Sequence, residues 1–275
     1  GVSTLLGNGD GTFQPALTKF VSTGNGSAAS GDLNHDGNLD LVLPNSTAKG
    51  VNVLLGNGDG TFGTATNFNI PTSLASSLYA LAVADLNHDG NQDVVAVEQL
   101  ASNAVTVLLG DGTGKLTVLT NYALGSAAAA VAIADLNNDG IPDLLVGTVG
   151  GYIQVMLGKG DGTFAIGAQL PVAGAGAIAV ADFNNDGQPD IVSAGNGSIS
   201  VLLNEFLPPL QIAQTATQVI LSWPTYATGF QVTTTTNCAS GSSWAVVTNA
   251  PTVSGSMNVL TNSITDTTRF YRLQN

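Results

Sequence analysis

Apolar and polar residues alternate along short segments of the first 207 residues, and the segments recur about every 50 residues. The alternation is clearest at residues 51–55, 105–109 and 153–157, where every second residue is apolar. A period of two places every second side chain on one face of a β-strand. The pattern therefore predicts strands that each bury one face.

Three other segment types accompany these alternating strands. Before the alternating strand, each repeat has a segment rich in alanine, at residues 80–84, 130–134 and 177–181. A continuous apolar run follows it, as expected of a strand covered on both faces, at residues 41–43, 94–97 and 144–146. A last strand is predicted after a Gly-Asp-Gly turn, at residues 62–70 and 164–170.

Four strands in each unit of about 50 residues, with the innermost rich in alanine, are typical of β-propeller blades. Complete units are predicted at 27–70, 76–122 and 126–170, with half a unit before them and three strands after them. We expect a partial ring of blades, with further sequence upstream. A β-solenoid is the alternative, but its repeats are shorter and carry a different Gly-rich motif.

Composition supports an all-β chain and disfavours two classes of binding partner, nucleic acids and membranes. The chain has 34 glycines, and Glu98 and Glu205 are its only glutamates, which disfavours helices. The net charge of −13 opposes binding to nucleic acid and to anionic membranes. The longest apolar run, 127–134, is too short to span a bilayer, so no membrane insertion is expected.

Most of the negative charge lies in four loops that align without gaps. They read DLNHDGNLD, DLNHDGNQD, DLNNDGIPD and DFNNDGQPD, and their starts are 53, 50 and 47 residues apart. Oxygen-bearing side chains occupy positions 1, 3, 5 and 9, a backbone carbonyl is available at position 7, and glycine at position 6 permits a sharp turn. Calcium takes six to eight such oxygen ligands. The loops lack the glutamate of an EF-hand at position 12, and strands flank them.

Two interpretations of these loops differ in what neutralises the carboxylates. Asp and Asn commonly hydrogen-bond their own backbone in Asx turns. However, three carboxylates within each loop repel one another without a cation. We therefore predict about four Ca²⁺ ions and interpret His35 and His88, at position 4, as solvated. Positions 1, 3, 5 and 9 would bind through their side chains and position 7 through its backbone carbonyl. The predicted ligands are Asp32, Asn34, Asp36, Asn38, Asp40, Asp85, Asn87, Asp89, Asn91, Asp93, Asp135, Asn137, Asp139, Ile141, Asp143, Asp182, Asn184, Asp186, Gln188 and Asp190.

The aspartate loops and the alanine-rich strands before them resemble FG-GAP/VCBS repeats, the blades of integrin-α-like propellers. The resemblance covers residues 1–207. It implies blades of a ring that usually has seven, with calcium loops on one rim. This chain has too few blades for that ring, so closure of the ring is not expected from these residues alone.

The repeat stops after residue 207, and residues 207–209, Leu-Pro-Pro, are interpreted as a linker. Val219, Leu221 and Trp223 then alternate with polar residues. The segments LSWP, SSWAVVTNAP and FYRLQ are similar to the fibronectin-type-III-like modules that end many secreted bacterial proteins. We expect a propeller part at 1–207 and a small Ig/fibronectin-III-like β-sandwich at 208–275. The single cysteine, Cys238, allows no intramolecular disulfide.

These features predict a secreted or cell-surface calcium-binding propeller that acts as a non-catalytic adhesion, scaffold or ligand-binding module for a protein or a polysaccharide. An enzyme is disfavoured because both histidines lie in the loops and no nucleophile–base set can be assembled. One alternative is a lectin that uses Tyr79, Tyr122 or Tyr152. Two others are a fibre subunit that self-associates by strand addition at open blade edges, and an accessory domain of a polysaccharide-active enzyme.

Overall fold

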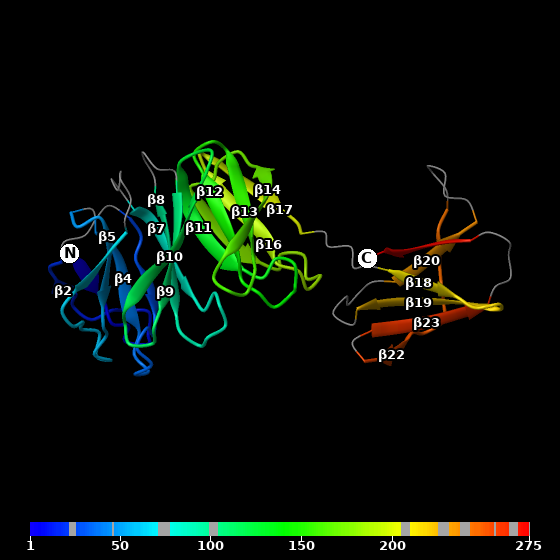
Figure 1. Ribbon diagram of the computed structural model, residues 1–275, viewed down its shortest axis with the longest axis horizontal. Helices are drawn as coiled ribbons and strands as arrows, with labels where there is room; N and C mark the ends of the chain where they lie inside the picture. Colours follow the sequence, from blue (N-terminus) through cyan, green and yellow to red (C-terminus); the bar gives the residue numbers. More distant parts are fainter. Residues whose placement is uncertain are drawn as a thin grey trace. The chain divides into compact units, whose positions relative to one another are not determined.

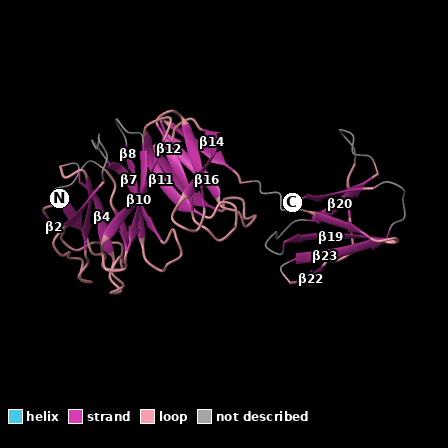
Figure 2. Ribbon diagram, in the orientation of Figure 1, coloured by secondary structure: helices cyan, strands magenta, loops and turns pink. Residues whose placement is uncertain are grey.

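The computed structural model describes residues 1–21, 26–45, 47–70, 78–98, 104–204, 210–224, 231–236, 243–255, 257–263 and 269–274. These residues form 24 strands and no helix, which confirms the all-β prediction (Figure 2). No helix capable of crossing a membrane is found in them. Two compact units are present, one formed by Gly1–Ala181 with Asp190–Leu202 and the other by Asp182–Pro189 with Leu203–Asn275.

The first unit contains three complete antiparallel sheets whose four strands pair in chain order. They are β3 (Ala29–Gly31), β4 (Asp40–Asn45), β5 (Gly50–Leu54) and β6 (Thr66–Asn69); β7 (Leu78–Ala84), β8 (Asp93–Glu98), β9 (Ala104–Gly110) and β10 (Leu116–Ala123); and β11 (Ala128–Ala134), β12 (Asp143–Thr148), β13 (Tyr152–Gly158) and β14 (Phe164–Pro171). These sheets correspond to the three complete units predicted from the sequence.

Two partial sheets flank the complete ones. The chain begins with β1 (Val2–Thr4) and β2 (Leu17–Lys19), which supply the third and fourth strands of a unit. The last sheet has the first three strands, β15 (Ala177–Ala181), β16 (Asp190–Gly195) and β17 (Ser198–Leu202). Within the described residues no strand pairs with the outer edge of β17, and the ring of sheets is not closed.

Hydrophobic clusters lie between consecutive sheets. One cluster joins Val42 and Val53 of one sheet to Leu81 and Val94 of the next, and equivalent clusters join the following pairs. Alanine in the innermost strands allows β3, β7, β11 and β15 to approach one another, and neighbouring members of this series are in contact. Figure 1 shows the sheets succeeding one another in chain order. Each sheet is therefore stabilised chiefly by its neighbours in sequence.

A polar side chain in the middle of each third strand interrupts the apolar pattern. The amide of Asn67 donates to Asn52 at 3.3 Å, and the amide of Asn121 donates to Thr106 at 2.9 Å. In the third complete sheet the amide of Gln169 donates to Gln154 at 3.2 Å. Because each acceptor is buried, this cross-strand bond satisfies a polar group that would otherwise be costly to remove from water.

The second unit has one four-stranded and one three-stranded antiparallel sheet. The first pairs β18 (Gln211–Gln214), β19 (Gln218–Pro224), β23 (Met257–Ser263) and β22 (Thr252–Ser254), and the second pairs β21 (Ala245–Val246), β20 (Gln231–Thr235) and β24 (Phe270–Gln274). Residues of both sheets, including Trp223, Leu260 and Leu273, share one hydrophobic cluster. The predicted linker at 207–209 and Cys238 lie outside the described residues.

Candidate metal centre

Each aspartate loop joins the first two strands of its sheet, as the strand pattern predicts. Position 4 of every loop has a left-handed backbone, which non-glycine residues adopt infrequently. The φ values there are 58° for His35, 59° for His88, 56° for Asn138 and 60° for Asn185. Glycine at position 6 also has positive φ, between 83° and 89°. The four loops therefore share one tightly turned backbone.

Oxygen atoms of positions 1 and 3 converge on the same backbone amide. In the first loop Asp32 Oδ1 and Asn34 Oδ1 both accept from the amide nitrogen of Asp36, each at 3.2 Å. Asp32 Oδ2 accepts from Gly37 N at 3.0 Å. The same three contacts recur in the other loops at 2.8 to 3.2 Å.

Position 5 is held in place from both sides. Asp36 Oδ1 accepts from Asn38 N at 2.8 Å, and Asp36 Oδ2 accepts from the Asn34 side-chain amide at 2.9 Å. Donation from Asn34 and then from Asn38 holds the pKa of Asp36 below its usual range. In the second loop the amide of Asn91 lowers the pKa of Asp89 in the same way. These carboxylates are therefore ionised and aimed into the loop.

Position 9 plays a different part from the other aspartates. Asp40, Asp93, Asp143 and Asp190 are fully buried, and both oxygens of the first three accept backbone amides. Asp93 Oδ2 accepts from Leu86 N at 2.9 Å, and Asp93 Oδ1 accepts from Gly110 N at 2.9 Å. Asp40 and Asp143 make the equivalent pairs of bonds. The position-9 carboxylate thus ties the loop to the end of the third strand.

The glycine that receives this carboxylate explains the repeated Leu-Leu-Gly motif. Gly56, Gly110 and Gly158 lie so close to the carbonyl of position 8 of their own loops that a Cβ atom would overlap it. Only glycine permits this approach, so the third-strand motif and the aspartate loop depend on each other. The third-strand motif recurs in the sequence as Leu-Leu-Gly at 54–56 and 108–110 and as Met-Leu-Gly at 156–158, but nothing in it indicates a connection to the loops.

Burial raises the pKa of Asp93, against the lowering by the amides of Gly110 and Leu86. Repulsion from Asp89 and Asp85 raises it further. Burial likewise raises the pKa of Asp143, with repulsion from the carboxylates of its own loop added. In these two loops the neighbouring carboxylates therefore repel the charged form of the buried aspartate.

The donor set fits a hard cation such as calcium. Two carboxylates and one amide oxygen from positions 1, 3 and 5 surround one turn of backbone, and all are oxygen donors. Among the described residues, no three His, Cys, Asp or Glu side chains converge as metal ligands do. The position-9 carboxylate is directed at backbone amides in this arrangement. Ligation by it would use the remaining lone pairs of its oxygens.

Neighbouring loops also touch, which sequence analysis missed. His35, interpreted from the sequence as solvated, lies with Nε2 2.9 Å from Asn91 Oδ1 in the next loop. Gly114, in the hairpin turn of the second complete sheet, donates its amide to Leu33 O in the first loop at 2.9 Å. His35 and Asn91 are 56 residues apart and Leu33 and Gly114 are 81 residues apart, so no local pattern in the sequence indicates either contact.

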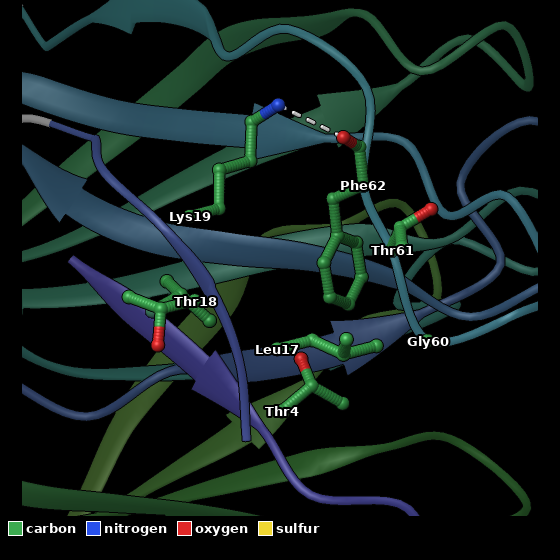
Figure 3. A pocket seen from close by; sticks show the side chains of 8 residues that line it. Thr4, Leu17, Thr18, Lys19, Gly60, Thr61 and Phe62 are labelled. Carbon is green, nitrogen blue, oxygen red and sulfur yellow. Dashed lines mark hydrogen bonds between the residues drawn. The ribbon is translucent and has the colours of Figure 1, made fainter. Parts of the chain in front are cut away.

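Two hollows lie elsewhere in the first unit. One, of about 230 Å³, lies between β1–β2 and the turn before Phe62 and contains one charged group. This is Lys19, whose ammonium donates to Phe62 O at 2.9 Å (Figure 3). The other, of about 620 Å³, is lined by the innermost strands and by Tyr79. Tyr122, which the lectin alternative also uses, does not line this hollow. Its hydroxyl accepts a hydrogen bond from Phe164 N at 2.7 Å, and its ring packs edge-on against the Phe164 ring.

The sequence matches the family described as "FG-GAP-like repeat" in three overlapping segments, residues 32–96, 85–146 and 135–193. Each segment begins at the first aspartate of a loop and ends in the second strand of the following sheet. Together they cover more than half of the chain. The chain belongs to this family. The resemblance stated from the sequence is thus confirmed for the FG-GAP-like repeats.

The solved structures that match the chain share little sequence with it. Two crystal structures of BBS1N in complex with ARL6DN, soaked with lead or mercury, are 15 and 17 % identical, with TM-scores of 0.46 and 0.44. The alignments cover 74 % of this chain and 66 and 64 % of those chains. The V. cholerae biofilm matrix protein Bap1 is 15 % identical, with a TM-score of 0.34, and the alignment covers 90 % of this chain and 50 % of that chain. The chain thus spans less than two thirds of each. No curated protein matches it significantly.

Proposed function

We propose that each of the four loops binds one calcium ion. The observation that carries the proposal is the fourfold repetition of one arrangement, in which oxygens of positions 1 and 3 meet at the amide of position 5. Asp32, Asn34 and Asp36, with their equivalents, would hold the ion, and position 9 would join them. The ion would supply positive charge to loops that otherwise collect carboxylates.

We propose that the calcium-loaded FG-GAP repeats form a non-catalytic, β-propeller-like module outside the cell, where millimolar calcium would keep such loops filled. The module would present a rigid surface for a protein or polysaccharide ligand. Support comes from the family match and from the buried position-9 aspartates, which accept backbone amides and so act as structural groups.

For residues 208–275 we propose a separate Ig/fibronectin-III-like β-sandwich. Two antiparallel sheets that share the cluster around Trp223 support this proposal. Arg272 adds a cation–π contact to Trp244, 4.2 Å from its ring centre. This module would attach the repeats to a surface or to a partner.

Counting the metal tests the calcium proposal directly. After gel filtration in about 2 mM calcium, a concentration above the usual Kd of extracellular sites, elemental analysis should find about four Ca²⁺ per chain. Replacing Asp85 and Asp89 together by Asn should remove about one ion. Asp59→Asn, in a hairpin turn outside the loops, should remove none. A chain that carries no calcium after this treatment would contradict the proposal.

A further inference from the structure

Two hydrogen bonds connect the first aspartate loop to the sheet that carries the second loop. One joins side chains, since His35 Nε2 lies 2.9 Å from Asn91 Oδ1. The other joins backbones, where Gly114 N donates to Leu33 O at 2.9 Å. Both His35 and Leu33 lie between predicted ligands of the first loop. A change in the backbone of that loop is therefore transmitted to the next sheet at two points.

The side-chain link ends at a predicted ligand of the second loop. Asn91 occupies position 7, where the backbone carbonyl is the predicted ligand, and its amide donates to Asp89 Oδ1 at 2.8 Å. A Cβ atom on Gly112 would overlap Asn91 Oδ1 and would lie 3.1 Å from the His35 ring. The side chain of Asn91 is thus held between the first loop and the hairpin turn of its own sheet.

The backbone link leads to the same loop by a second route. Gly114 lies in the turn that follows Gly110, whose amide donates to the buried carboxylate of Asp93 at 2.9 Å. Leu33 is buried in one hydrophobic cluster with Leu108, which lies in the strand before that turn. Displacement of Leu33 would therefore disturb the strand end to which the second loop is tied.

Apolar packing at the turns does not distinguish this pair of loops from the next pair. A Cβ atom on Gly114 would lie 2.9 Å from Leu55 of the preceding sheet. One on Gly162 would lie 3.0 Å from Leu109 in the same relation. Each turn thus packs its second glycine on a leucine of the sheet before it.

The polar links, by contrast, are confined to the first pair. Position 7 of the third loop is Ile141, whose side chain offers no acceptor to His88 of the second loop. No bond like that of Gly114 is found for Gly162 in the described part of the chain. The chain therefore contains one pair of neighbouring loops with polar links and one pair without them.

We propose that the first and second loops bind calcium cooperatively, with His35 and Asn91 as the positioning residues. This inference rests on the proposed calcium function. An ion in the first loop would fix the backbone on both sides of His35, and the two hydrogen bonds would then hold Asn91 and its turn. The second ion would meet a loop that is already ordered and would bind more tightly.

The coupling is reciprocal and of modest size. By linkage, an ion in the second loop must raise the affinity of the first by the same factor. Coupling between sites typically changes affinity about 5- to 150-fold, and two hydrogen bonds place this pair at the lower end, at about five-fold. Between the second and third loops, which lack these bonds, the factor should stay below about two-fold.

A calcium titration followed by NMR of the ¹⁵N-labelled full chain reports each loop separately. Position 6 of every loop is a glycine whose amide donates to the position-1 aspartate, a predicted ligand, so its signal should move when that loop fills. The four reporters are Gly37, Gly90, Gly140 and Gly187. The pH is held constant throughout, and a reducing agent keeps Cys238 from forming intermolecular disulfides.

Emptying the first loop tests the coupling. Replacing Asp32 and Asp36 together by Asn should raise the calcium midpoint of Gly90 about five-fold and that of Gly140 less than about two-fold. The converse experiment empties the second loop and should raise the midpoint of Gly37 by the same factor as that of Gly90.

Emptying the third loop is the matched control. Replacing Asp135 and Asp139 together by Asn should move the midpoint of Gly90 less than about two-fold, because no hydrogen bond joins these two loops in the described chain.

A single substitution tests the link itself. Asn91→Ile introduces the residue found at position 7 of the third loop and retains the backbone carbonyl, so the ligand set is unchanged. In this background, emptying the first loop should move the midpoint of Gly90 less than about two-fold. Asn38→Ile is the matched control, because Asn38 holds the same position in the first loop but forms no hydrogen bond with another aspartate loop among the described residues. It should leave the five-fold effect intact.

The outcomes separate this inference from the calcium proposal. If the glycines respond to calcium but Gly90 ignores the loss of the first loop, the coupling is wrong and calcium binding stands. If no glycine responds, both fail. An undiminished coupling in Asn91→Ile would show that His35 and Asn91 are not the link. Should the double variant of the first loop lose its dispersed spectrum, Asp36→Asn alone repeats the test and should act in the same direction.

Discussion

The four aspartates at position 9 look identical to the other loop aspartates in the sequence, yet all four are fully buried and have a distinct structural setting. Asp93 is buried and accepts the amide of Leu86 in its own loop and the amide of Gly110 at the end of β9. Asp89 is exposed and accepts within its own loop. The two residues should therefore respond differently when calcium is removed.

Asp93→Asn is expected to destabilise the chain even in the presence of a chelator. The amide group of the new Asn would face a backbone N–H with one of its own donors, so a charge-assisted bond is lost and a buried donor is left unpaired. The free energy of unfolding should fall by about 2 to 4 kcal/mol.

Urea denaturation in a chelator measures this effect. Asp89→Asn is the matched control and should cost under about 1 kcal/mol there, since its carboxylate is solvated and its bonds are local. Equal effects for the two substitutions without calcium would show that position 9 has no separate structural task.

The sequence predicted the candidate ligands by their spacing but not how position 9 is used. The pattern D-x-N-x-D-G-x-x-D is local, whereas the amide of Gly110 lies 17 residues from Asp93. Likewise, nothing local in the sequence indicates that His35 meets Asn91, 56 residues away. Contacts across a repeat depend on how sheets stack, which residue types alone do not specify.

At the scale of the strands, the sequence performed better, because strand periodicity is a local property. The alanine-rich, apolar and alternating segments became β7, β8 and β9 in the order predicted. The Gly-Asp-Gly turn was recognised as a hairpin turn, but its packing on the leucine of the preceding sheet was not foreseen. Left-handed glycines in these turns serve that contact as well as the turn itself.

Gly162→Ala should destabilise the chain more than Gly151→Ala, although both positions have φ of 78° in the same sheet. A methyl group on Gly162 would lie 3.0 Å from Leu109 and 3.1 Å from Leu119, whereas on Gly151 it would meet only Val172 O at 3.4 Å. Both substitutions incur the backbone cost of the left-handed region, about 1 to 2 kcal/mol.

The overpacked interface should cost Gly162→Ala about 1 to 3 kcal/mol more. Thermal unfolding of the two variants side by side gives the difference, since the backbone term cancels. If the two melt together, the leucine–glycine contact contributes nothing to the packing of one sheet on the next.

For the whole molecule, calcium removal should lower the melting temperature of the repeats. At millimolar calcium, sites with Kd of about 0.1 to 1 mM each stabilise the folded state by roughly 1 kcal/mol. Four sites then contribute about 4 kcal/mol, which corresponds to a shift of roughly 8 to 16 °C for a unit of this size.

Differential scanning fluorimetry with and without a chelator measures the shift. Asp161→Asn, in a hairpin turn where the carboxylate accepts from Thr163, should leave the calcium-dependent part unchanged. A melting temperature indifferent to chelator would mean that hydrogen bonds alone hold the loops.

The division into a repeat part and a second module is also testable at this scale. Limited proteolysis in calcium should cut first near residues 207–210, where the repeat pattern ends in the sequence. The released fragment, residues 208 to 275, should keep a cooperative melting transition if it is an independent sandwich. Mass spectrometry of the products identifies the cleavage site. A first cut inside residues 32–40 would show that the predicted boundary is wrong.

The stacking of sheets in chain order also determines how the molecule would respond to a pulling force. Each complete sheet packs mainly on its neighbours in sequence, so tension applied at the two ends would detach sheets one at a time. Because successive loops start 53, 50 and 47 residues apart, each event would release roughly 170 Å of extended chain. A molecule built in this way would lengthen in steps under load and dissipate energy at each step before its whole length is extended.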